Sequence, residues 1–167
     1  MTNNVPLDLL GKHINGVPEA YTLSTTKSDN GIIYMVDVLD YYFGKPYTMV
    51  FITADNNDII QNFAIYVDEI IDKPFYEEMV AEYGEPNCMF KKGKITSVDT
   101  TIAKNDLFES KGRTTYELEE CTFDESPVVF GWHKENYDIQ VIIGDESDTF
   151  QKTRIIFGKG ILANIDK

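Results

Sequence analysis

The chain has 167 residues, of which 13% are aromatic, and its formal net charge at pH 7 is −13. This length suffices for one domain with a hydrophobic core or for two small fused units. The acidic balance argues against nucleic acid as a partner, because phosphate binding needs clustered Lys and Arg, and it permits fast association with a basic protein. No apolar run reaches the roughly 18–20 residues of a membrane-spanning helix, so we expect no membrane span.

The N-terminal sequence MTNNVPLDLL has neither the basic start nor the apolar run of a secretory signal peptide. We therefore expect a cytoplasmic protein, with a periplasmic or extracellular location as the alternative if a leader has been removed. Cys88 and Cys121 are too few for a disulfide framework, so we expect both thiols to be reduced.

The first half of the chain predicts one short helix followed by strands. The helix runs from about Pro6 to Ile14, with leucines at helical spacing, and GVP (16–18) closes it. A half-exposed strand follows over 34–43, where apolar and acidic residues mix. Residues 47–68 then read as an apolar run, the acidic break ADNND and a second apolar run, which is the pattern of a β-hairpin.

A second, stronger helix is predicted over residues 74–83. Asp72 can cap its start, Pro74 suits the first turn, and Gly84 stops it. The apolar residues fall on one stripe, so we expect this face to pack against a sheet while Glu78 and Glu82 stay in solvent. The stripe consists of Phe75, Met79, Val80 and Tyr83.

The second half of the chain contains further predicted strands. NCMFKKGKITSV (87–98) reads as two strands joined by a tight turn at KKGK, and 103–113 reads as a flexible loop. Residues 116–125 resemble the half-exposed strand of the first half. PVVFGWHK (127–134) reads as a strand that pairs onward through a turn at Glu135–Asn136.

Residues 137–158 repeat the hairpin pattern of residues 47–68 without a gap. We predict two superposable hairpins and a tandem α-β-β-β arrangement, with a first unit over 1–70 and a second unit with extra strands over 71–167, fused into one globular domain. The predicted fold class is α+β, a tandem helix-plus-antiparallel-hairpin repeat that forms one sheet with helices packed on one face. The identical pairs are Tyr47/Tyr137, Ile52/Ile142, Asp55/Asp145, Asp58/Asp148, Gln61/Gln151 and Ile65/Ile155.

Three stretches carry a resemblance to known families: AEYGEP (81–86), TYELEE (115–120) and YDIQVIIGDESDTFQKTRIIF (137–157). A short helix that ends in Gly-x-Pro, then a tyrosine-containing strand, then a hairpin with an acidic turn resembles the module of the small outer-membrane lipoproteins of the barrel-assembly machinery. In tandem it is similar to the secreted β-lactamase inhibitor proteins. The resemblance implies a protein-binding scaffold rather than an enzyme, and it assigns no functional residue.

No catalytic residue, metal site or cofactor is predicted. His13 and His133 stand alone, without the spacing of metal ligands, and there is no Gly-x-Ser-x-Gly elbow, P-loop or glycine-rich dinucleotide turn. The only tryptophan, Trp132, is either a core residue or an exposed interface anchor.

These observations favour a non-enzymatic protein that binds or inhibits another, basic protein, with an immunity protein that neutralises a basic toxin as the specific case. The candidate contacts are Asp37, Glu117 and Glu119, with Trp132 as the hydrophobic anchor. A small-ligand-binding protein or enzyme with a pocket between sheet and helices is one alternative. An envelope assembly module without its leader is the other. The sequence leaves the oligomeric state open.

Overall fold

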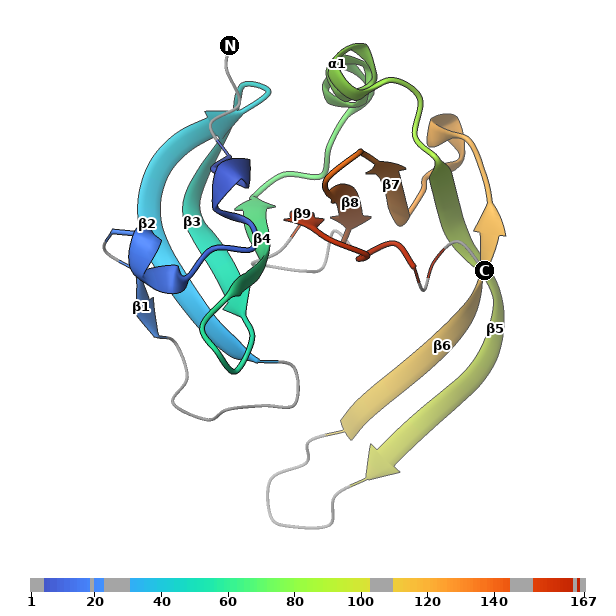
Figure 1. Cartoon of the computed structure of the whole chain (residues 1–167). Helices are drawn as coiled ribbons and strands as arrows, with labels where there is room; N and C mark the ends of the chain where they lie inside the picture. The colour runs from blue at the N-terminus through green and yellow to red at the C-terminus, as the bar shows by residue number, and fades with distance from the viewer. Residues whose placement is uncertain are drawn as a thin grey trace.

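The computed structural model describes residues 5–18, 20–22, 31–102, 110–144, 152–163 and 165. Within these residues, nine strands form one antiparallel sheet in the order β1-β2-β3-β4-β9-β8-β7-β5-β6 (Figure 1). The strands are β1 (Tyr21–Thr22), β2 (Ile32–Tyr42), β3 (Lys45–Ala54), β4 (Ile60–Val67), β5 (Cys88–Ile102), β6 (Ser110–Glu120), β7 (Val129–His133), β8 (Asp138–Ile143) and β9 (Thr153–Gly158). The helices are α1 (Lys73–Tyr83) and the short 3₁₀ turns η1 (Leu7–Leu9), η2 (Ile14–Gly16) and η3 (Phe123–Glu125).

This architecture contradicts the predicted tandem helix-plus-antiparallel-hairpin repeat with helices packed on one face, because the described residues contain a single α-helix. The helix expected from Pro6 to Ile14 is replaced by η1 and η2. Gly11 between them has a φ of 80°, which ends any right-handed helix. The backbone there bonds to the start of β4 instead: Gly11 N–H donates to the Ile60 carbonyl at 2.9 Å, and Ile60 N–H donates to the Lys12 carbonyl at 2.9 Å.

Both halves of the sequence repeat form antiparallel hairpins, as predicted. β3 pairs with β4 and β8 pairs with β9, and the two hairpins meet where Ile65 of β4 lies opposite Ile155 of β9. These two isoleucines are equivalent positions of the repeat, so the hairpins are related by an approximate local two-fold axis between them. The second predicted loop is GDESD (144–148), and its residues 145–148 lie outside the described residues.

The two hairpins are not superposable residue by residue, because their registers differ by one. Val50 lies opposite Ile65, whereas Val141, and not the aligned Gln140, lies opposite Ile155. A one-residue slip exchanges the two faces of a strand. Here the slip places Val141 in the core, fully buried, and leaves Gln140 on the other face.

The prediction of a tight turn at KKGK is wrong, because residues 91–94 lie within the long strand β5. The register between β5 and β6 shifts from Lys92 to Ile95, so a β-bulge takes the place of the turn. Gly93 sits so close to Glu119 that a Cβ atom would lie 2.6 Å from its side chain. Residues 103–109 of the predicted flexible loop lie outside the described residues, and 110–113 belong to β6.

The helix predicted over 74–83 is confirmed. The Asp72 side chain accepts a hydrogen bond from Phe75 N–H at 3.1 Å, and Gly84 ends the helix with a φ of 82°. Met79 is fully buried and Val80 packs against the core, while Glu78 and Glu82 are exposed, as expected from the apolar stripe. α1 therefore covers one face of the sheet, where the hydrophobic core lies.

No helix in the described part of the chain is both long and apolar enough to cross a membrane.

Candidate functional site

β5 and β6 form a two-stranded arm beyond the point where the rest of the sheet ends. β5 pairs with β7 only through Cys88, Met89 and Phe90, so residues 91–102 and 110–119 pair only with each other among the described strands. Figure 1 shows this hairpin extending away from the other strands. An isolated two-stranded ribbon is only marginally stable in water. Contacts with the rest of the sheet therefore add little stability to this extension. We call residues 91–102 and 110–119 the arm.

One face of the arm carries large apolar side chains that the described residues leave in solvent. Tyr116 lies opposite Ile95, and Leu118 lies opposite Lys92, so these four side chains share a face. The Lys92 Nζ atom stands 5.0 Å from the centre of the Tyr116 ring. We call the four exposed apolar residues of this face the arm patch: Ile95 (54% exposed), Val98 (62%), Tyr116 (37%) and Leu118 (48%).

The opposite face of the arm carries the predicted acidic contacts. Glu117 and Glu119 are exposed, and because they are two residues apart they point to the same side of β6. Glu119 lies opposite Lys91, whose ammonium forms a 2.7 Å ion pair with Glu125 of η3. Lys91 and hydrogen bonds from Thr122 lower the pKa of Glu125 to about 2.

The structure brings only two of the four predicted contacts together. Asp37 is exposed on β2, which lies at the other end of the sheet from β6. Trp132 is 1% exposed on β7, and its indole Nε1 donates a 2.7 Å hydrogen bond to the Gly84 carbonyl. The expectation that Trp132 is an exposed anchor is therefore wrong, because packing against Phe130 and Tyr83 holds its ring in the core.

Sequence reasoning missed the arm patch. The mix of apolar and acidic residues over 116–125 predicts a half-exposed strand, and that pattern does not specify which face is covered. Only the strand order shows that the row of Tyr116 and Leu118 has no covering element among the described residues.

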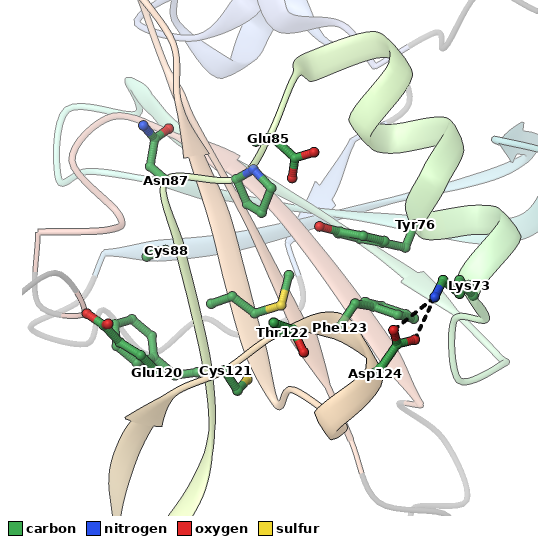
Figure 2. Close-up of a pocket in the computed structure, with 13 residues that line it drawn as sticks. Lys73, Tyr76, Glu85, Asn87, Cys88, Glu120, Cys121, Thr122, Phe123 and Asp124 are labelled. Atoms are coloured by element: carbon green, nitrogen blue, oxygen red, sulfur yellow. Dashed lines mark hydrogen bonds and ion pairs between the residues drawn. The ribbon is translucent and has the colours of Figure 1, made fainter.

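A cleft of about 630 Å³ lies at the root of the arm, between α1, the start of β5 and η3 (Figure 2). The rings of Tyr76 and Phe123 stack across its wall, with centres 4.3 Å apart and planes 10° apart. The Lys73 ammonium closes one end through a 2.7 Å ion pair with Asp124. In Figure 2 the side chains of Tyr76 and Phe123 lie between α1 and η3, whereas Glu120 points away from α1.

Two titratable groups that line the cleft, Cys121 and Tyr76, have raised pKa values. Burial raises the pKa of the Cys121 thiol, which leaves it protonated and a weak nucleophile. Burial and a hydrogen bond with Glu85 raise the pKa of Tyr76. Neither cysteine is joined in a disulfide, and the described residues contain no group of three or more His, Cys, Asp or Glu side chains placed to hold a metal ion.

A second, smaller cavity of about 160 Å³ lies between β2, β3 and the N-terminal segment. Its walls are apolar, with Val36, Val38 and Ile52 among them, and its polar groups are the Asp40 carboxylate and the Tyr47 hydroxyl. Burial and the hydrogen-bonded Asp40 carboxylate raise the pKa of Tyr47 to about 12. This site could hold one small apolar molecule with a polar or cationic end.

Comparison with known proteins finds no matching family model, no matching curated protein and no matching solved structure.

Proposed function

We propose that this chain is a non-enzymatic protein that binds, and thereby inhibits, a basic partner protein through the arm. An immunity protein that neutralises a basic toxin is the specific form of this proposal. The observation that carries it is the arm patch: four large apolar side chains exposed together on an extension that the rest of the described chain does not cover. Contiguous exposed apolar surface of this kind marks interaction sites.

The chemistry of the arm favours a protein as the occupant of this surface. Tyr116 and Leu118 offer broad apolar area for contact, and aromatic residues are enriched among the side chains that dominate binding energy. A small molecule would need a concave site, whereas the arm is a ribbon with residues 114–120 all exposed. The contact surface is therefore suited to a macromolecule.

Charge favours a basic partner. The chain carries a net charge of −13, and β6 contributes Glu117, Glu119 and Glu120 next to the arm patch. Opposite charge on the partner would steer the encounter and raise the association rate. A like-charged partner would be repelled, so the same charge also limits which proteins can bind.

The test is affinity capture from the organism that encodes the chain, followed by identification of the bound protein by mass spectrometry. The arm variant combines Tyr116→Ser with Leu118→Ser. The matched control is Leu39→Ser, which removes a leucine that is 75% exposed at the opposite end of the sheet. Circular dichroism of all three proteins checks that the substitutions leave the fold intact.

We expect the wild-type chain and Leu39→Ser to retain a protein with an isoelectric point above about 9, and the arm variant to lose it. Inhibition of that protein's activity by the wild-type chain would identify the inhibitor role. Retention that does not depend on the arm residues, an acidic partner, or no retained protein at all would reject the proposal.

A small-ligand function is the second candidate, and the cavity next to Asp40 is the observation that favours it. Its apolar walls and single carboxylate suit a small amine, with the cation at Asp40. Methyl NMR signals of Val36 and Val38 should then shift when such an amine is added, and Asp40→Asn should abolish the shift. Unchanged methyl signals with a panel of aliphatic and aromatic amines would rule this candidate out.

A further inference from the structure

We propose that the partner adds a strand to the open edge of β6, through an extended segment in which basic and apolar residues alternate. This inference rests on the proposed function and specifies how the arm is used. The added strand would run antiparallel to β6, as every neighbouring pair in the described sheet does. It would use both faces of the arm at once.

β6 is the last strand of the described sheet, so one of its two edges has no partner strand there. The backbone groups of odd-numbered and even-numbered residues point to opposite edges. Cys121 N–H donates to the Met89 carbonyl at 3.1 Å, so the backbone of Cys121 faces β5. The Thr115 carbonyl also faces β5, where it accepts a 3.2 Å hydrogen bond from the Thr96 hydroxyl. Because successive residues of a strand turn their backbone groups to alternate sides, odd-numbered residues of β6 face β5 and even-numbered residues face the open edge.

This parity holds along the whole exposed part of β6. The register shifts between the two strands insert their extra residues in β5, between Lys92 and Ile95 and between Ile95 and Ser97. β6 therefore alternates without interruption. No other described strand pairs with it. The N–H and C=O groups of Tyr116 and Leu118 are thus available to an incoming strand.

Side-chain direction follows the same parity and sets the chemistry of that strand. In an antiparallel pair, residues that exchange backbone hydrogen bonds with Tyr116 and Leu118 lie directly opposite them and share their face. Those residues would therefore be apolar. The residues between them would lie on the face of Glu117 and Glu119, where a positive charge is favourable and an acidic one is not.

The acidic residues would also limit which strands can pair with this edge. Charged side chains on an edge strand suppress indiscriminate pairing between sheets. Glu117 and Glu119 lie on one face of β6 and would repel an acidic strand from the open edge. They would accept one whose basic residues fall on the matching face. Their placement thus makes the edge selective for a basic segment.

The experiment uses synthetic heptapeptides in which Lys and Val alternate, labelled with fluorescein and titrated with the full chain by fluorescence anisotropy. One variant is N-methylated at the valines, whose N–H groups would donate to β6. Its matched control is N-methylated at the internal lysines, whose N–H groups would point away. A third peptide carries Glu in place of every Lys.

We expect the parent peptide and the lysine-methylated control to bind with dissociation constants within about threefold of each other. The valine-methylated peptide should bind at least tenfold more weakly, and the glutamate peptide should show no binding. The double variant Glu117→Gln, Glu119→Gln should weaken binding of the parent peptide at low salt.

Equal affinity of the two methylated peptides, or no binding of the parent, would overturn strand addition. Either result leaves the proposed function open to its own capture test, because contact through the arm patch does not require the backbone of β6. Analytical ultracentrifugation of the chain alone then tests whether the chain forms a dimer. A dimer that disappears in Leu118→Ser would assign the edge to a second copy and also overturn the proposal.

Discussion

The indole Nε1 of Trp132 donates a hydrogen bond of 2.7 Å to the carbonyl oxygen of Gly84. Trp132 lies in β7, and Gly84 ends α1, so this bond joins the end of the helix to the sheet beneath it. The tryptophan is 1% exposed. Without the indole donor, a carbonyl at the end of the helix would lose its partner within the protein.

Replacing Trp132 with Phe should lower the free energy of unfolding by about 2–4 kcal/mol, mainly through the cavity left by the smaller buried ring, with a smaller part from the lost hydrogen bond. Urea denaturation measures this value. Tyr116→Phe is the control, because it removes only a hydroxyl from a residue that is 37% exposed, and it should change stability by less than about 0.5 kcal/mol. Equal effects of the two substitutions would show that the Trp132–Gly84 bond contributes nothing specific.

The buried face of α1 supplies a second prediction. Met79 is fully buried between α1 and the sheet, so Met79→Ala should cost about 2–4 kcal/mol of unfolding free energy. Glu78→Ala on the exposed face should change it by less than about 0.5 kcal/mol. Thermal or urea denaturation of both variants provides the comparison. A small loss at Met79 would mean that the helix does not hold this face against the core.

The Glu125 carboxylate should titrate far below an ordinary glutamate. The Lys91 ammonium, with hydrogen bonds from Thr122, lowers its pKa from 4.5 to about 2. A carboxylate with a depressed pKa in the folded state stabilises the fold above its unfolded pKa. That contribution should be lost as the pH falls from about 4.5 towards 2. Carbon-detected NMR across this range follows the Glu125 signal directly.

Lys91→Ala should return the pKa of Glu125 towards its ordinary value, because the contact with Lys91 makes the largest contribution to the shift. Lys94→Ala removes a charge from the same strand without removing this ion pair, and it should leave the titration of Glu125 nearly unchanged. If both lysine variants had the same effect, general charge rather than the Lys91 contact would set the pKa.

Association with the partner should depend on salt and on the acidic face of the arm. Reversing charge with Glu117→Lys and Glu119→Lys together should slow association several-fold at low ionic strength, and less at high ionic strength where the attraction is screened. Stopped-flow measurements over a salt series give these rates. Glu119→Lys alone and Asp37→Lys at the other end of the sheet change the net charge by the same amount, so Asp37→Lys is the control for the single reversal. Equal rates for these two single variants would assign the effect to net charge alone.

Elements whose signals are carried by neighbouring residues can be predicted from the amino-acid sequence. Asp72, the apolar stripe of Phe75 and Met79, and Gly84 specify α1, because capping and helical periodicity act within a few residues. The repeated apolar runs likewise specified two hairpins. The acidic row of Glu117 and Glu119 on an exposed strand face was also readable from alternation.

Strand register and side-chain burial could not be predicted in this way, because both depend on which elements lie next to each other in the fold. The N-terminal segment bonds to β4 rather than to itself, so no first helix forms. The slip that buries Val141 instead of Gln140 is set by pairing with β9. Trp132 is in the core, and Tyr116 and Leu118 are exposed, although all three are large and apolar. Burial is a property of the neighbours a side chain meets in space, and β7 has α1 above it while the arm has no cover among the described residues.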